Sequence, residues 1–240
     1  MTLSLIIPTR ARRESLGRFT RSLIATTADC ANLELVLVID EDDSTYDEMT
    51  FDHLRTVRLR VPAGQTMSDL NLAGYRACSG DYIMLMNDDV VLRTPDWDKL
   101  VLSVFDDYRD GIVLVHVNDT LFRSKLCTFP LVTRSYCAIA EGICPSGYRR
   151  YRIDDHIHNV FNRLSVLGHN RIVYLPDVVF EHLNVNTDNH GNASYQFDAS
   201  IHEMDGHRYD ATVPERKALA RQLAETIALS RRRTYGRDLE

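Results

Sequence analysis

Polar side chains that could bind an anionic ligand and a metal follow three apolar segments of the sequence. Pro8-Thr9-Arg10 follows the first segment, Asp40 the second, and Asn87-Asp88-Asp89 a later one. If these segments are parallel strands of one sheet, their carboxyl ends meet at one edge, where such sheets bind ligands. Carboxylates that converge there repel one another, and a divalent cation is the usual neutraliser, especially where phosphate oxygens complete its shell. We therefore expect a cation site beside an anion-binding site.

Helix capping is the alternative explanation for some of these acids. Asp42 and Asp43 could each be an N-cap or a turn residue, because Asp is common at both kinds of position. Asp89 is followed by the apolar residues 90–92 rather than by a helix start, so capping explains little there. Asp89 is therefore the stronger candidate for a functional carboxylate, and we expect it to face solvent at the end of its strand.

The elements that must position these residues alternate between apolar runs and helical patterns in the first half of the chain. Near-continuous apolar runs joined by helices are typical of a mainly parallel sheet with helices on both faces, an α/β fold. The predicted helix over residues 68–77 has Ser68 as its cap. The other predicted elements are strands over 3–7, 35–39, 56–61 and 81–86 and a helix over 12–25.

The second half of the chain continues this pattern and ends in a helical tail. Residues 184–212 are polar and aperiodic, which is typical of a functional lid or of a solvated connector, and we favour the lid. The helix predicted over 214–235 has a narrow apolar face that could dock on the preceding domain or on a second subunit. Upstream, the pattern predicts helices over 97–108 and 154–167 and strands over 112–117, 171–176 and 178–180.

Composition and charge exclude several classes of protein. The 240 residues are 44% hydrophobic and 26% charged, as in an ordinary globular chain with one sizeable core. A formal net charge of −6 gives no general attraction to nucleic acid or anionic lipid. No stretch approaches the roughly 18–20 apolar residues of a membrane span, and no basic leader precedes the first strand, so we expect a cytoplasmic protein. The five cysteines show no CxxC spacing and are predicted to be free thiols.

Several other chemistries lack their motifs. The first strand leads into Thr9-Arg10-Ala11-Arg12-Arg13, so neither a dinucleotide fingerprint nor a phosphate-binding loop of the GxxxxGK[ST] type is present. No GxSxG sequence follows a strand, which argues against a serine hydrolase. The glycine-rich opening of sugar nucleotidyltransferases is also absent.

Four segments, in order and spacing, resemble family 2 glycosyltransferases. They are Leu5-Ile6-Ile7-Pro8-Thr9-Arg10, the strand-end acids of residues 38–45, Ser79 to Asp89, and the second-half segments that contain Asp154-Asp155 and Gly168 to His182. The resemblance covers about residues 3–183. It implies the A-type nucleotide-diphosphosugar transferase fold and a divalent-metal-dependent sugar transferase that uses Mn²⁺ or Mg²⁺.

The resemblance also assigns residues to the donor site. It implies that Thr9 and Asp40 lie near the base and ribose, and that Asp89 holds the metal. Asn87 stands where the family has the first Asp of its Asp-x-Asp motif, so it would contact the ribose or the metal as a neutral group. The family's usual Arg-Asn-x-Gly stretch is replaced by residues 70–74. The remaining residues expected to bind the nucleotide sugar are Pro8, Arg10, Asn71 and Asp88.

The resemblance places an acid pair on the acceptor side. Asp154 and Asp155 stand where the family has Glu-Asp, whose second member is generally the catalytic base. Two adjacent acids at a helix start cannot both point into one cleft, so one can cap the helix while the other accepts a proton; we favour Asp155 as the base. Both acids could instead merely favour the helix N-terminus. His182 falls where the family often supplies a further metal ligand, the alternative being a structural surface histidine.

These expectations define a metal-dependent, inverting glycosyltransferase. It would move a sugar from a nucleoside diphosphate donor, UDP being favoured, to a hydroxyl acceptor. The alternative is a non-catalytic domain of the same fold that binds a nucleotide sugar or another partner. We expect a catalytic domain over residues 1–183, with a nucleotide-sugar half over about 1–95 and an acceptor half over about 96–183. Residues 184–240 would form the lid and the terminal helix. The sequence identifies neither the sugar nor the acceptor, and a homo-oligomer is compatible with it.

Overall fold

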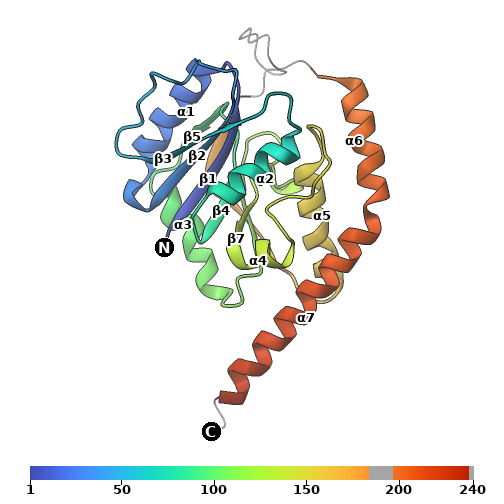
Figure 1. Cartoon of the computed structure of the whole chain (residues 1–240). Helices are drawn as coiled ribbons and strands as arrows, with labels where there is room; N and C mark the ends of the chain where they lie inside the picture. Colours follow the sequence, from blue (N-terminus) through green and yellow to red (C-terminus); the bar gives the residue numbers. More distant parts are fainter. Residues whose placement is uncertain (184–196, 238–240) are drawn as a thin grey trace.

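The structure, a computed structural model, describes residues 1–183 and 197–237. Within these residues one sheet forms the centre of the molecule (Figure 1). Its strands are β1 (Leu3–Thr9), β2 (Leu33–Asp40), β3 (Arg55–Val61), β4 (Tyr82–Leu85), β5 (Val90–Leu92), β6 (Leu114–Asn118), β7 (Leu131–Thr133) and β8 (Ile172–His182).

The sheet has a parallel half and a mixed half, in the order β3-β2-β1-β4-β7-β6-β8-β5. Strands β3, β2, β1 and β4 pair in parallel, as the apolar runs predict. Strand β7 is antiparallel to both β4 and β6, whereas β8 is parallel to β6 and antiparallel to β5. The carboxyl ends of β1, β2 and β4 therefore lie at one edge, and the end of β8 is joined to that edge through β5.

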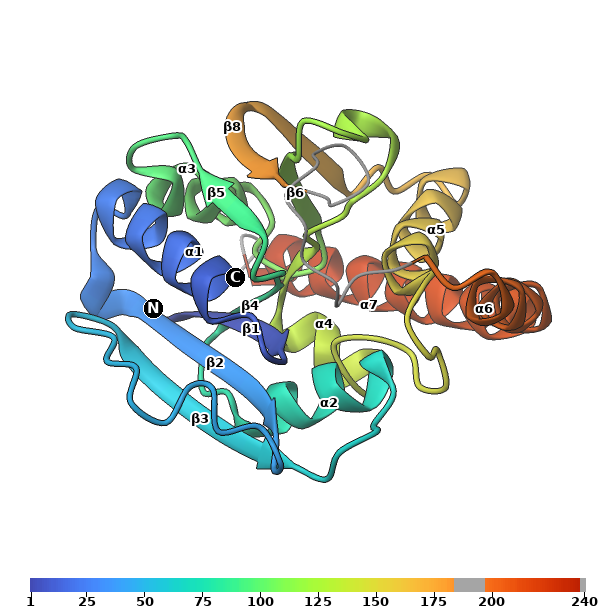
Figure 2. The same cartoon turned by 90° about the horizontal axis from the view of Figure 1, so that it is seen from above.

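Helices cover both faces of the sheet, which confirms the predicted α/β class. Helices α1 and α3 pack on one face, while α2, α4, α5 and α7 pack on the other (Figure 2). The helices are α1 (Arg13–Thr26), α2 (Met67–Ala77), α3 (Trp97–Ser103), α4 (Arg134–Ile139), α5 (Ile153–Val166), α6 (Ala199–Ala211) and α7 (Val213–Arg237).

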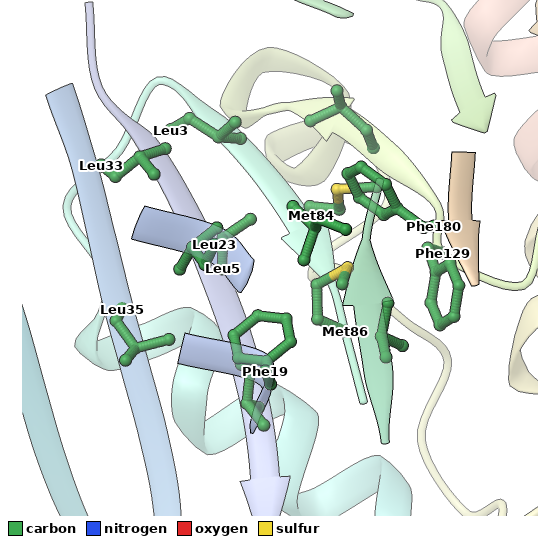
Figure 3. Packing of buried hydrophobic residues seen from close by; sticks show 14 of the residues in the cluster. Leu3, Leu5, Phe19, Leu23, Leu33, Leu35, Met84, Met86, Phe129 and Phe180 are labelled. Carbon is green, nitrogen blue, oxygen red and sulfur yellow. The ribbon is translucent and has the colours of Figure 1, made fainter. Parts of the chain in front are cut away.

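Alternate residues of β1 build two hydrophobic cores. Leu5 points to the side of α1, where it packs with Phe19 and Leu23 (Figure 3). Ile6 points to the opposite side and joins the cluster that includes residues of α2 and α5. Because both faces of the central strands are buried, these strands are apolar at nearly every position rather than at alternate positions.

Three local predictions need correction. Helix α2 is capped by Thr66, whose side chain accepts the N–H of Asp69 while the Asp69 carboxylate accepts the N–H of Thr66. Ser68 instead lies inside the helix. The predicted helix over 97–108 is shorter and continues as a 3₁₀ turn at Val104–Asp107, and the two strands predicted over 171–180 are one strand, β8.

The tail contains one more helix than the sequence predicts. The expectation of an aperiodic segment over 184–212 is wrong for residues 199–211, which form α6; residues 184–196 lie outside the described part of the chain. Helix α7 packs on α5 through Ala220, Leu223 and Ile227, and Figure 1 shows its carboxyl end extending away from the sheet. The domain boundary at residue 183 stays a prediction. None of the described helices is long and apolar enough to cross a membrane.

Candidate active site

Asp89 and His182 are brought together by the pairing of β5 with β8. Val90 lies opposite His182 in this antiparallel pair, and the N–H of Leu183 donates to the carbonyl of Asp89 at 2.9 Å. This register places Asp89 Oδ1 at 3.2 Å from His182 Nε2. The amide nitrogen of Asn87 lies 3.4 Å from the same ring nitrogen. Three of the predicted site residues therefore form one cluster.

The guanidinium of Arg12 joins this cluster from the start of α1. It lies 3.2 Å from Asp88 Oδ1 and 3.2 Å from Asp89 Oδ2. Sequence reasoning missed Arg12, although the basic Arg10-x-Arg12 spacing directly after a strand end was a usable signal. A side chain of the protein thus supplies part of the positive charge that we expected a metal to provide.

The pKa values of Asp88 and Asp89 are shifted in opposite directions. Both Asp88 and Asp89 are buried, so the expectation that Asp89 faces solvent is wrong. Burial raises the pKa of Asp88 to about 6, against the attraction of Arg12 and a 2.6 Å hydrogen bond donated by Thr9. Burial also disfavours the charged form of Asp89, but His182 and Arg12 outweigh it and hold the pKa of Asp89 below its ordinary value. Asp89 therefore stays ionised in the cluster.

The unsatisfied atoms of the cluster fit a divalent cation. Asp89 Oδ1 is buried and lacks a well-aligned hydrogen-bond partner, and the ring nitrogen that faces it, at 3.2 Å, is His182 Nε2. His182 Nδ1 is also buried without a partner, but it lies on the other side of the ring. A carboxylate oxygen and an imidazole nitrogen are suitable ligands for Mn²⁺, and a carboxylate suits Mg²⁺. The described residues hold no group of three or more His, Cys, Asp or Glu side chains arranged for a metal. A cation here would thus need further ligands from a bound molecule or water.

The predicted nucleotide-binding residues of β1 and β2 lie at the same edge of the sheet. Thr9 is buried and its hydroxyl lies 2.7 Å from Tyr46 Oη, a second contact residue that the sequence did not reveal. Arg10 forms ion pairs with Asp40 and with Asp42, the latter at 2.8 Å. A guanidinium and a carboxylate at the rim can recognise a phosphate and a ribose hydroxyl, respectively.

Three further candidates are Asp43, Pro8 and Asn71. Asp43 accepts the N–H groups of Ala11 and Thr45 at 2.8 and 2.9 Å, so it orders a turn rather than capping a helix. Pro8 belongs to β1, one residue before Thr9. Asn71 is buried within α2.

The acid pair lies in the first turn of α5. Asp154 Oδ1 accepts the N–H of Asp155 at 2.9 Å, and Asp155 Oδ2 lies 3.4 Å from Arg152 Nη1. The protein atoms around Asp154, and then the charge of Asp155, raise the pKa of Asp154 to about 7. Asp155 is partly exposed and can reach a ligand. The two neighbours thus have different environments, as roles of support and proton acceptance would require.

The loop between β6 and β7 contacts both the Asp89–His182 cluster and the acid pair Asp154-Asp155. The carbonyl of Asp119 accepts the N–H of His182 at 3.2 Å, and its carboxylate accepts the N–H groups of residues 121–123. The thiol of Cys127, farther along the loop, lies 3.5 Å from the carbonyl of Asp154. Asp119 is buried and was missed from sequence, because only the folded loop shows which amides it binds.

The fold is the A-type glycosyltransferase fold, and the predicted donor residues other than Asn71 gather at the carboxyl edge of its sheet. The sequence model described as glycosyl transferase family 2 matches residues 4–129. The chain belongs to this family. No curated protein matches it.

Solved structures with the same fold include three glycosyltransferases of low sequence identity. Residues 1–349 of S. aureus TarS are 13% identical with a TM-score of 0.61, and the match covers 99% of this chain and 73% of that one. Mannosyltransferase PcManGT from Pyrobaculum calidifontis, in complex with GDP-Man and Mn²⁺, is 12% identical with a TM-score of 0.60, covering 95% and 75%.

Glucosyl-3-phosphoglycerate synthase from Mycobacterium tuberculosis, in complex with Mn²⁺, UDP and phosphoglyceric acid, is 14% identical with a TM-score of 0.56. The match covers 90% of this chain and 78% of that one. In two other TarS structures this chain spans 36% and 59% of the matched chain.

Proposed function

We propose that the protein is a metal-dependent glycosyltransferase that moves a sugar from a nucleoside diphosphate donor to a hydroxyl acceptor. The observation that carries the proposal is the buried Asp89–His182 pair, in which Asp89 Oδ1 lacks a well-aligned hydrogen-bond partner and faces His182 Nε2 at 3.2 Å, at the sheet edge that also holds Thr9 and Asp40. Membership of glycosyl transferase family 2 supports the same reaction class. A cytoplasmic location stays a prediction.

Asp89 and His182 are the residues that would hold Mn²⁺ or Mg²⁺. When bound, a divalent cation there neutralises charge on the departing diphosphate. Arg12 contributes a second positive charge, since its guanidinium already contacts Asp89 at 3.2 Å and could turn toward a phosphate. Two neighbouring structures are complexes with Mn²⁺, which supports a divalent ion as the cofactor.

The donor nucleotide would bind along the ends of β1 and β2. Thr9 and Asp40 offer hydrogen bonds to the base and ribose, and Asn87 is a neutral contact for the ribose or the metal. Pro8, Arg10, Asn71 and Asp88 complete the proposed set. The matched structures hold UDP, UDP-GlcNAc or GDP-Man, and we favour UDP for this chain.

Asp155 would act as the general base for a single displacement with inversion at the anomeric carbon. It takes the proton of the acceptor hydroxyl as the oxygen attacks the sugar, while the ion pair with Arg152 holds its carboxylate at the start of α5. Asp154, whose pKa is about 7, supports the helix start through the N–H of Asp155. Inversion follows from the absence of an evident nucleophile and from the family resemblance, and NMR of the product sugar tests it.

Thermal unfolding with a panel of nucleotide sugars tests donor and metal together. We expect one of the UDP-, GDP-, dTDP- or CMP-sugars to raise the Tm in the presence of Mn²⁺ and to raise it less in EDTA, because ligands that bind the native state stabilise it. If none of them shifts the Tm with Mn²⁺ present, the proposal is wrong.

A non-catalytic nucleotide-sugar-binding domain is the second candidate. Two observations favour it: Asn87 replaces a carboxylate of the metal motif, and Arg12 competes for Asp89. Metal-dependent release of free sugar from a donor that binds would exclude it. Binding without any release over many hours would support it instead of the enzyme.

A further inference from the structure

The buried residue of helix α6 is a carboxylate, while the partly buried Tyr209 packs against the core and Arg208 Nε donates to the carbonyl of Ser146 at 2.9 Å. Asp205 is the single buried residue of this helix, and its side chain is 1% exposed. The helix therefore presents no fully buried apolar side chain to the core. A buried carboxylate is unfavourable unless its oxygens accept hydrogen bonds, so its presence at this position needs an explanation.

The carboxylate of Asp205 binds three successive backbone amides. Its Oδ1 accepts the N–H of Arg149 at 2.8 Å, and its Oδ2 accepts those of Arg150 at 2.9 Å and Tyr151 at 2.7 Å. Successive N–H groups that converge in this way form a nest for an anion. Bonds from N–H groups to an ionised carboxylate are among the stronger hydrogen bonds in proteins, so this segment is firmly held.

The bound segment leads directly into the acid pair. Arg152, the next residue, is the N-cap of α5 and has a φ of 70°, in the left-handed region. A non-glycine residue keeps this conformation only where its surroundings hold it. Arg152 in turn forms the 3.4 Å ion pair with Asp155. Residues 149–152 therefore connect Asp205 to Asp155 through an unbroken series of contacts.

The segment that contains Arg149 is also bound to the start of α2, in the predicted nucleotide-sugar half. The carbonyl of Arg149 accepts the N–H of Met67 at 2.9 Å, and the hydroxyl of Ser68 accepts the N–H of Tyr148 at 3.0 Å. The segment is thus held between the start of α2 and the middle of α6. Without Asp205, this segment would be bound to α2 alone, and three of its backbone amides would lose their acceptor.

We propose that Asp205 is a positioning residue for the acceptor side: it sets the course of residues 149–152 and, through them, the location of Asp155. This inference rests on the proposed function, because it assigns the role of Asp205 by way of Asp155 as base. It makes α6 part of the proposed active site, although the helix begins seventeen residues beyond His182.

Hydrolysis of a donor by water provides a test that needs no knowledge of the acceptor. The probes are UDP-GlcNAc and GDP-mannose with Mn²⁺, and the readouts are release of free sugar and the calorimetric Kd of the donor. We expect Asp205→Asn to lower the turnover rate by about 10- to 100-fold with the donor Kd unchanged, since small displacements of a catalytic group have effects of this size. Asp205→Glu keeps the carboxylate and should recover part of the rate.

Asp198→Ala is the matched control. Asp198 also binds backbone amides of α6, those of Ser200 and Ile201 at 3.0 and 3.1 Å. Its hydrogen bond to the segment comes from its backbone N–H, which donates to Tyr151 Oη at 3.1 Å and remains in the variant. Its carboxylate attracts Arg150, whereas the amides of residues 149–151 donate to Asp205. Loss of the Asp198 carboxylate destabilises the helix start and should leave the turnover rate within about twofold of wild type. Hydrogen exchange should become faster at the amides of residues 149–151 in Asp205→Asn and not in the control.

A double-mutant cycle separates positioning from general damage. If Asp205 acts through Asp155, the variant Asp155→Asn/Asp205→Asn should be no slower than Asp155→Asn alone. Losses that multiply, or an Asp205→Asn protein with the wild-type rate, would overturn the inference. If Asp205→Asn does not fold, the same cycle with Asp205→Glu decides. A wild-type protein that neither binds nor hydrolyses a nucleotide sugar would instead disprove the proposed function.

Discussion

The proposed donor edge and the proposed acceptor side of this protein are held together in different ways. At the donor edge, Thr9, Asp88, Asp89 and His182 are buried, and the ends of neighbouring strands bring them together. On the acceptor side, Asp155 is partly exposed, and its helix start depends on a segment bound by a carboxylate of a distant helix. The family match covers residues 4–129, which include most of the first region and none of α5.

This difference indicates which changes should affect donor binding and which should affect turnover. The positions of the donor residues follow from strand register, which cannot shift without turning side chains to the other face of a buried sheet. The position of the acid pair follows from a few polar contacts between segments far apart in the chain. We therefore expect changes at the donor edge to abolish binding, and changes on the acceptor side to alter turnover with the donor still bound.

The largest effect is expected from Asp89→Ala. Loss of this carboxylate removes a proposed metal ligand and should lower metal-dependent turnover by about 1000-fold, at the upper end for a single electrostatic group. The fold should persist, because Arg12 keeps its contact with Asp88. Sugar release from the donor measures the effect, and Asp47→Ala, which breaks an exposed ion pair with Arg60, is the control. Full activity of Asp89→Ala would remove the metal argument.

Asp155→Asn should lower turnover by about 100-fold with little change in donor affinity, as loss of a general base predicts. Steady-state kinetics and donor titration measure the two quantities. Asp154→Asn is the neighbouring control and should retain more of the rate. If Asp154→Asn alone produces the loss, the assignment within the acid pair must be reversed.

An effect no larger than these losses of turnover is expected in the pH dependence of stability, through Asp154 on the acceptor side. The pKa of Asp154 is raised from 3.8 to about 7, so the folded state binds its proton more tightly than the unfolded state does. The stabilisation from this proton is complete below about pH 4 and is lost as the pH rises through 7. Asp154→Asn, which has no such group, should therefore gain roughly 2–3 kcal/mol relative to wild type between pH 5 and pH 8.

Thermal unfolding of both proteins at pH 5 and pH 8 checks this expectation. Asp88, whose pKa is raised to about 6, titrates in both proteins, so its contribution cancels in the difference. An equal difference in Tm at the two pH values would show that Asp154 is not protonated near neutral pH in the folded protein.

The smallest effect is expected at the start of α2. Thr66→Ala removes the cap and its reciprocal bond with Asp69, which should lower the free energy of unfolding by about 1 kcal/mol. Donor affinity should not change, because the register of β1 and β2 is independent of this cap. Urea unfolding compares the variant with Thr50→Ala, an exposed loop position. Equal stability of the two variants would contradict the role of the cap.

The sequence predicted the parallel half of the sheet and the donor cluster because both depend on strong local patterns. Apolar runs define β1 and β2, and polar residues at their ends must meet once the strands pair in parallel. Helix α6 was missed because its buried residue is Asp205 rather than a set of apolar residues at helical spacing. Helical periodicity cannot detect a helix whose buried residue is a carboxylate.

Arg12 and Asp119 were missed for a related reason. Each acts on atoms far away in the sequence: Arg12 on Asp88 and Asp89, and Asp119 on His182 through its carbonyl. The burial of Asp89 was also misjudged, since β5 and β8 cover a strand end that the sequence alone leaves open. Long-range polar contacts of this kind appear only once the strands are assembled.

Donor titration of three proteins tests the separation of the two regions most directly. Calorimetry with Mn²⁺ and the nucleotide sugar that stabilises the wild type should give a measurable Kd for the wild type, a similar Kd for Asp205→Asn, and no detectable binding for Asp89→Ala. Loss of donor binding in Asp205→Asn, or retained binding in Asp89→Ala, would contradict the account, because the donor edge would then depend on the tail or not depend on Asp89.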